Sequence, residues 1–162
     1  MRRRGATVKP GPAGSLRVGI EESLDVFVAR WNAQRLAASI GFIGPAPQEI
    51  AIVVSELATN ILKYGVRGGI LMQPVHDAAH GAGLELVADD DGPPLFDFAV
   101  ALQDGFGDRG PIDPGTLIGR GGIGGGLGAI ARLTDLFEYL PGPPRKSFHA
   151  VRYLRRPRRA AR

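Results

Sequence analysis

Three polar residues at helical spacing, Glu56, Asn60 and Lys63, are the first candidates for chemistry in this sequence. They occupy positions i, i+4 and i+7, so on a helix they form one stripe along the border of its apolar face. In such a row the carboxylate can orient or deprotonate a nucleophile, the amide oxygen can bind Mg²⁺, and the amine can offset phosphate charge. The alternative is an amphipathic helix with a solvated Glu–Lys face, and the helix alone leaves both interpretations open.

A run of three aspartates, Asp89 to Asp91, follows a strand-like segment and leads into Gly92-Pro93-Pro94. The functional interpretation is a buried aspartate that accepts a hydrogen bond from an amino group such as the exocyclic amine of adenine. The alternative is an exposed turn, since Asp, Gly and Pro are all typical turn residues. A metal cluster is disfavoured because successive acids point in different directions.

Glycine is concentrated at residues 119–128, which contain seven glycines and precede a predicted helix. Glycines let backbone N–H groups approach a phosphate closely, and a helix N-terminus favours negative charge. A surface loop without a ligand is the alternative. Residues 124–129 match the G-x-G-x-x-A pattern of dinucleotide-binding folds but lack the strand that must precede it, and the sequence has no P-loop motif.

The elements that must position these residues do not follow strict βαβα alternation. We predict strands at 15–20, 69–75, 84–88, 136–140 and 148–154, and helices at 21–40, 47–64, 97–103 and 126–134. Hairpin strands with helices gathered on one face indicate an α+β fold, a two-layer α/β sandwich whose sheet is mixed and mostly antiparallel.

Apolar spacing assigns a buried face to each of the two long helices. In the second helix that face holds Ile50, Val53, Val54, Leu57 and Ile61. In the first helix the residues near helical spacing are Leu24, Val28, Trp31, Leu36 and Ile40. We also place Phe27 and Trp31 in the core.

Length and composition bound the class of protein. The chain of 162 residues is 44% hydrophobic and 22% charged, which fits one globular domain. The absence of cysteine excludes a disulfide scaffold, a thiolate zinc site and a cysteine nucleophile. No apolar run approaches the ~18 residues of a membrane span. The basic start is not followed by the apolar stretch of an export signal, so we expect a cytoplasmic protein.

The net charge of +4 comes from the two ends of the chain. Eight of the 20 basic residues are arginines within 2–4 and 155–162, and the remainder holds 12 basic and 16 acidic residues. We therefore expect a mildly acidic domain at 15–154, a disordered basic tail at 1–14 and an arginine-rich tail at 155–162. The tails are either solvated or in contact with a polyanion. A base-stacking platform is poorly supported, because Tyr153 is the only aromatic residue near the terminal arginines.

In their order along the chain, the three motifs resemble the N, G1 and G2 boxes of the Bergerat-fold (histidine kinase-like) ATPases, over roughly residues 15–154. Within that class, Ser-Glu-Leu-Ala-Thr-Asn at 55–60, Asp104-Gly105-Phe106, and Gly-Gly-Ile-Gly-Gly-Gly-Leu-Gly at 121–128 resemble the RsbT-type serine kinases. These kinases regulate anti-sigma-factor and stressosome switches. The Asp-Gly-Phe element separates this branch from the RsbW-type anti-sigma factors.

The resemblance implies a role for each matching residue. Asn60 matches the Mg²⁺-binding asparagine, Glu56 the acid that positions or activates the attacking hydroxyl, and Lys63 a frequently basic position. Asp90 matches the acceptor of the adenine amine, with Gly92 beside the base. The other nucleotide-binding residues that it implies are Gly122, Gly124, Gly126 and Leu127 at the phosphates and Ser147 near the adenine.

The sequence departs from the family pattern at two places. Pro94 stands where the family has a glycine, and proline fixes φ and removes an N–H. Residues 107–120, between the Asp-Gly-Phe element and the G2 box, are longer than the usual lid. Both departures bear on turnover more than on nucleotide binding.

The function implied by the resemblance is an ATP-dependent serine/threonine protein kinase that uses Mg²⁺. Its implied partner is a STAS-domain anti-sigma antagonist or a stressosome-like protein, and further a phosphatase or sigma-factor regulator, in a bacterial partner switch. An alternative is an ATP-gated anti-sigma module that binds its partner with little or no catalysis. A third function, nucleic-acid binding through the basic tails, predicts salt-sensitive binding that requires residues 155–162.

Overall fold

The computed structural model describes residues 7–11, 14–95, 97–103, 106–107, 110–111 and 126–155. The strands are β1 (Val8–Pro10), β2 (Leu16–Ile20), β3 (Gly68–Asp77), β4 (Gly81–Asp90), β5 (Phe106–Gly107), β6 (Gly110–Pro111), β7 (Leu136–Leu140) and β8 (Lys146–Tyr153). The helices are α1 (Ser23–Ile40), α2 (Ala46–Tyr64), α3 (Phe98–Ala101) and α5 (Gly126–Leu133). This order matches the predicted one, with β1 and the β5–β6 pair added.

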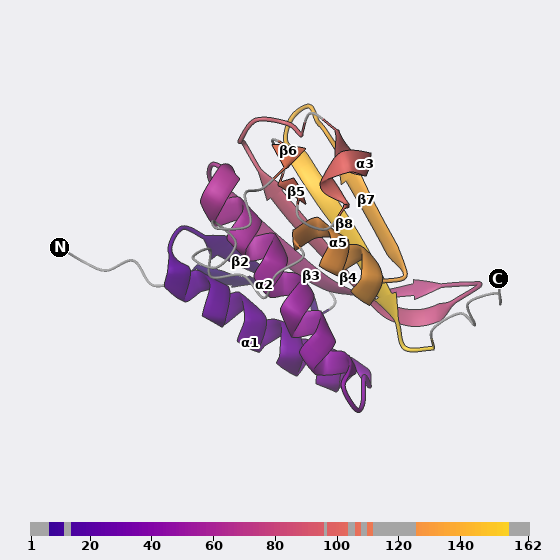
Figure 1. Cartoon of the computed structure of the whole chain (residues 1–162). Coiled ribbons are helices and arrows are strands. Elements are labelled where there is room, and N and C mark those ends of the chain that lie inside the picture. Colours follow the sequence, from indigo (N-terminus) through magenta and orange to yellow (C-terminus); the bar gives the residue numbers. More distant parts are fainter. Residues whose placement is uncertain are drawn as a thin grey trace, which may run out of the picture.

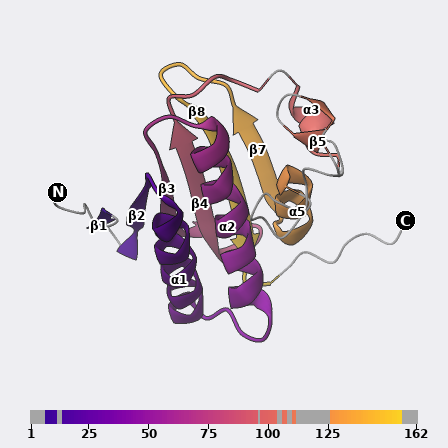
Figure 2. The same ribbon diagram turned by 60° about the vertical axis from the view of Figure 1, so that its left-hand side comes forward.

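The two layers of the fold are a sheet and a group of helices (Figure 1). The sheet has six strands in the order β1-β2-β3-β4-β8-β7, and each of its described pairings is antiparallel. Helix α2 lies against the sheet between α1 and α5 (Figure 2). The predicted two-layer α/β sandwich is therefore confirmed. The expected parallel component of the sheet is absent from the described residues.

The core lies between α2 and the central strands. The predicted face of α2 is confirmed, since Ile50, Val53, Val54, Leu57 and Ile61 are all buried. Strand β4 alternates as a half-covered strand does, and every second residue from Leu84 to Asp90 points to the helices. Phe148 and Ala150 of β8 complete this layer. The apolar residues of β4 that pack against α2 thus determine that the Asp90 side chain also points to the buried face of the sheet.

Helix α1 follows the predicted core face only in part, since Val28, Leu36 and Ile40 pack partly buried against the core. Its buried residues are Asp25, Ala29, Ala33 and Ala37. Leu24, Phe27 and Trp31 are 58%, 65% and 56% exposed, so the placement of Phe27 and Trp31 in the core is wrong. The physical reason is that α1 packs closely against both α2 and the sheet, and alanine allows a closer approach than larger side chains do. The Arg35 guanidinium covers Trp31 from outside, 4.5 Å from the ring centroid.

Three boundaries differ from the predicted ones in ways that affect function. Strand β4 continues through Asp89 and Asp90, which we had placed in a turn. Strand β8 begins at Lys146, two residues before its predicted start. Residues Val8–Pro10 pair with β2, so part of the segment expected to be a disordered tail is a strand. Seven of the eight terminal arginines lie outside the described residues.

A bilayer-spanning helix would need both length and uniform apolarity. None of the helices within the described ranges combines the two.

Candidate functional site

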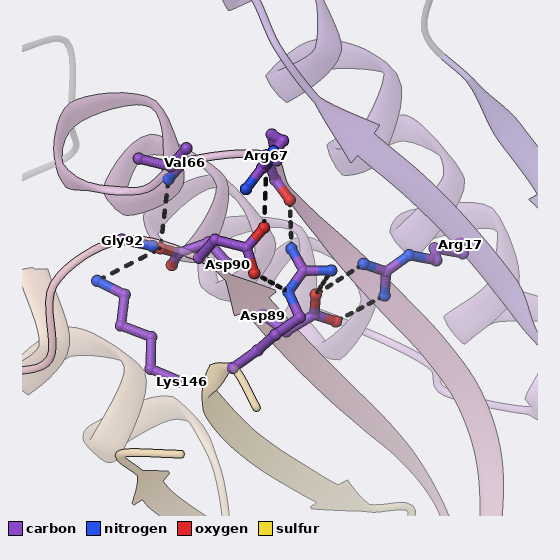
Figure 3. A network of polar contacts seen from close by, with 9 residues as sticks. Arg17, Val66, Arg67, Asp89, Asp90, Gly92 and Lys146 are labelled. Carbon is purple, nitrogen blue, oxygen red and sulfur yellow. Dashed lines mark hydrogen bonds and ion pairs between the residues drawn. The ribbon is translucent and has the colours of Figure 1, made fainter. Parts of the chain in front are cut away.

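Asp90 is the last residue of β4, on the side of the sheet that faces the helices, and it is only 3% exposed. Its Oδ1 atom accepts hydrogen bonds from the backbone N–H of Gly92 at 2.6 Å and of Val66 at 3.3 Å (Figure 3). Val66 follows the C-terminus of α2, so these contacts hold the end of β4 against the end of that helix. The structure therefore brings the acidic segment to the second half of α2.

Three glycines surround the Asp90 side chain so closely that a Cβ atom at any of them would collide with it. A Cβ at Gly92 would lie 2.6 Å from Asp90 Oδ1, one at Gly65 2.8 Å from Asp90 Cγ, and one at Gly68 2.9 Å from Asp90 Cβ. Backbone therefore encloses the carboxylate and fixes its orientation. The position of Gly92 beside a bound base stays a prediction.

The two carboxylate oxygens of Asp90 differ in their surroundings. The Gly92 and Val66 N–H groups and the Lys146 ammonium, at 3.5 Å, all approach Oδ1. Oδ2 has no polar partner within the described part of the chain. An oxygen in this state, on a side chain that is 5% exposed, is an acceptor available to a ligand donor.

The aspartates on either side of Asp90 have different partners. Asp89 binds the Arg17 guanidinium through two hydrogen bonds of 2.7 and 2.8 Å and Arg145 at 3.0 Å. Asp91 pairs with Arg67 at 3.1 Å and with Arg145 at 3.0 Å. The hydrogen bond to Asp89 raises the pKa of Arg17. The three acids thus diverge, as expected, and the described residues contain no group of acids and histidines that could hold a metal ion.

Ser147 does not lie beside Asp90. In the register of β4 and β8, Ser147 pairs with Asp89 and Lys146 pairs with Asp90. The Ser147 hydroxyl oxygen lies 3.1 Å from Nε2 of His149, its neighbour on the face away from the helices. The placement of Ser147 near the adenine stays a prediction. The predicted strand began at Phe148, so Ser147 had no assigned face; because β8 begins at Lys146, Ser147 lies within the strand, and side chains alternate between the two faces of a sheet.

Lys146 is the residue at this position that sequence reasoning missed. Its side chain is 5% exposed, and its ammonium donates to the Pro93 carbonyl at 2.8 Å. A signal was present in the sequence, because β4 and β8 were both predicted. Extending each strand by two residues makes a lysine the cross-strand neighbour of Asp90.

The three residues of the polar stripe on α2 become more exposed toward the C-terminus of the helix. Glu56 is 5% exposed, Asn60 is half-buried, and Lys63 is exposed. The helix runs without interruption from Ala46 to Tyr64, so the three residues share one stripe as predicted. A solvated Glu–Lys face is excluded for Glu56, since its carboxylate is buried among the core residues of α2. Oxygen donors of this type, an amide beside a carboxylate, suit Mg²⁺.

Helix α5 begins at Gly126, whose φ of +48° lies in the left-handed region that favours glycine. Leu127 is buried, and α5 packs against α2. The start of α5 and the stripe of α2 thus belong to one packed unit. Gly122 and Gly124, like Asp104 and Gly105, lie outside the described residues, and their roles remain predictions.

Comparison with known proteins agrees with this arrangement of motifs. No protein-family model matches the sequence. The chain is 32% identical over 121 residues to the serine/threonine-protein kinase RsbT of Bacillus subtilis (strain 168), which covers 75% of this chain and 82% of that protein. The similarity thus extends over most of both chains, and this protein belongs to the RsbT family.

Proposed function

We propose that this protein is an ATP-dependent serine/threonine kinase that phosphorylates a serine of a STAS-domain anti-sigma antagonist. The observation that carries the proposal is Asp90, a buried carboxylate with one oxygen held by backbone N–H groups and the other without a described partner. In a member of the RsbT family, a donor on the base of a nucleotide is the natural partner for that second oxygen.

Asp90 and Gly92 would form the base end of the nucleotide site. Oδ2 of Asp90 accepts a hydrogen bond from the exocyclic amine of adenine. The tight packing of Gly65, Gly68 and Gly92 supports this role, because a carboxylate enclosed by backbone loses little freedom when the base binds. The base edge then lies beside the end of α2.

Asn60, Lys63 and the N-terminus of α5 would form the phosphate end. Mg²⁺, when bound, neutralises charge on the phosphates. The amide oxygen of Asn60 is the protein ligand we assign to it, and Lys63 contributes positive charge from the exposed end of the stripe. Backbone N–H groups at Gly126 and Leu127, with those predicted at Gly122 and Gly124, contact the phosphate oxygens.

Glu56 would act on the attacking hydroxyl. It lies one helical turn before Asn60 and is buried, so its carboxylate is held at a fixed depth beside the metal ligand. From there it orients the serine hydroxyl and accepts its proton as the phosphoryl group transfers. Positioning and charge neutralisation supply most of the acceleration in this class of reaction.

The biological setting we propose is a bacterial sigma-factor or stress partner switch in the cytoplasm. Membership of the RsbT family supports a regulatory kinase of this kind. The acceptor is a serine on a STAS-domain protein or a stressosome-like assembly. An ATP-gated binding module with little catalysis is the alternative that the experiments must separate from a kinase.

Calorimetric titration of Mg-ATP tests the nucleotide site. Asp90→Asn removes the negative charge and converts one of the two carboxylate oxygens into an NH2 group of similar size, which cannot accept a hydrogen bond. We therefore expect Mg-ATP to bind about ten- to a hundredfold more weakly than to wild type. Asp91→Asn is the matched control, because Asp91 faces Arg67 and Arg145 instead. We expect the control to bind within about twofold of wild type.

Two results would overturn the proposal. One is a folded wild-type protein, verified by circular dichroism, that binds no Mg-ATP. The other is an Asp90→Asn variant that binds Mg-ATP as tightly as Asp91→Asn does.

A further inference from the structure

The Lys146 ammonium is a buried positive charge that the site described above does not use. Its side chain is 5% exposed, and lysine is almost never buried without a partner. It points to the helix-facing side of β8, directly across from Asp90 in the strand register (Figure 3). Such a group calls for an explanation in terms of what its charge contacts.

The described contacts do not use all the donors of Lys146. An ammonium has three N–H donors. One reaches the Pro93 carbonyl at 2.8 Å, and a second faces Asp90 Oδ1 at 3.5 Å. The second contact is longer than the roughly 2.7–2.9 Å of a good charge-assisted hydrogen bond, and Oδ1 already accepts from Gly92 and Val66. The third donor has no partner among the residues that the structure describes.

Asp90 and Lys146 together therefore offer one free acceptor, Oδ2, and one free donor, Nζ, side by side. Adenine has the complementary pair, because its N6 amine donates and the ring nitrogens next to it, N1 and N7, accept. A carboxylate alone recognises only the amine. A carboxylate with a neighbouring ammonium recognises two adjacent atoms, which also fixes the rotation of the base in its plane.

We propose that Lys146 is a second base-reading residue of the nucleotide site, whose ammonium donates a hydrogen bond to the adenine ring nitrogen beside the amine bound by Asp90. This inference rests on the proposed function, since it requires that the Asp90 site binds ATP. If Lys146 only held Pro93 against β8, replacing an adenine ring nitrogen with C–H would not change the affinity of the protein for the nucleotide.

The test compares ATP with 1-deaza-ATP and 7-deaza-ATP by calorimetric titration into the wild-type protein with Mg²⁺. Each analogue replaces one ring nitrogen with C–H and keeps the N6 amine that Asp90 would bind. We expect one of the two analogues to bind about ten- to a hundredfold more weakly than ATP, and the affected analogue identifies the nitrogen.

Variants assign that effect to Lys146. Lys146→Met keeps the apolar stem and removes the ammonium, so we expect it to bind ATP and the affected analogue with equal affinity. Arg145→Met is the matched control, because it removes the neighbouring cation, which pairs with Asp89 and Asp91 on the other side of Asp90. The control is expected to discriminate between ATP and the analogue as wild type does.

The outcomes separate this inference from the proposed function. Wild type that binds ATP and both analogues equally overturns the role of Lys146 and leaves the ATP site intact. A Lys146→Met variant that still discriminates against the analogue overturns it as well. Wild type that binds no ATP contradicts both proposals. The analogue comparison on wild type requires no variant, so equal binding of ATP and both analogues would overturn the role of Lys146 even if Lys146→Met fails to fold.

Discussion

Helices α1 and α2 lie side by side on the same face of the sheet (Figure 2), yet the apolar side chains that they fully bury differ in size. Helix α2 buries large aliphatic residues together with the carboxylate of Glu56. Helix α1 fully buries Asp25 and three alanines and leaves Leu24, Phe27 and Trp31 exposed. Both helices have apolar residues at helical spacing, but that spacing marks the fully buried residues only in α2; in α1 it marks residues that are partly buried or exposed.

The comparison separates two determinants of burial. The spacing of apolar residues shows that a helix has an apolar face. The space between the helix and its neighbours decides which of its side chains are buried. Helix α1 packs against α2 and three strands, where alanine suits the close approach. Helix α2 lies over the centre of the sheet and has room for Leu57 and Ile50. Glu56 is buried on that same helix, one turn before Asn60, and this position is the reason we assign it a role in the chemistry.

The largest expected effect on stability is on α2. Leu57 is fully buried in the core, so Leu57→Ala removes buried methyl groups and leaves a cavity. We expect the free energy of unfolding to fall by about 2–5 kcal/mol. Urea denaturation followed by circular dichroism measures this change. A loss below about 1 kcal/mol would contradict the central position of α2 in the core.

A smaller loss is expected when α1 receives a large side chain on its alanine face. Ala33 is fully buried, and Ala33→Leu forces extra atoms between the helix and its neighbours. We expect a decrease of about 1–3 kcal/mol in the free energy of unfolding, measured in the same urea titration. If Ala33→Leu were neutral or stabilising, the alanine face would not be the packed one.

The smallest effect is expected on the outer face of α1. Trp31→Ser removes the largest side chain of the helix, but more than half of that side chain is exposed. We expect a change within about 0.5 kcal/mol, apart from the loss of its contact with Arg35. The measurement is again urea denaturation. A loss comparable to that of Leu57→Ala would show that Trp31 is buried, as the spacing had predicted.

Much of the fold followed from the sequence for physical reasons that these helices illustrate. Helix α2 has an unambiguous apolar face, a proline near its start and Gly65 after its end, so its limits and core residues were predicted. The face of α1 was predicted only in part, because size and apolarity ranked Trp31 above Ala33. Ala33 is buried and Trp31 is exposed because of the elements that pack against α1, and the sequence does not give these contacts directly.

The site was predictable in part. The sequence singles out Asp90 by the Asp-x-Gly-Pro pattern that follows a predicted strand, whereas its burial and its place within β4 come from the structure. The faces of Lys146 and Ser147 were not predicted, since the two predicted strands each stop two residues short of the pairing between Asp90 and Lys146. Their faces depend on the register of β8 against β4, which is set by hydrogen bonds between segments more than 50 residues apart.

The central claim is that the buried Glu56 of α2 serves phosphoryl transfer, and one assay tests it directly. Wild type and Glu56→Gln are each incubated with Mg-ATP labelled at the γ-phosphate and a STAS-domain antagonist, and label on the antagonist's serine is measured. We predict transfer by wild type, a decrease of about 10²–10⁴-fold in Glu56→Gln, and unchanged Mg-ATP affinity in the variant. Transfer by Glu56→Gln at the wild-type rate would contradict the account. So would wild type that binds both Mg-ATP and the antagonist without transferring label, which is the behaviour of an ATP-gated binding module.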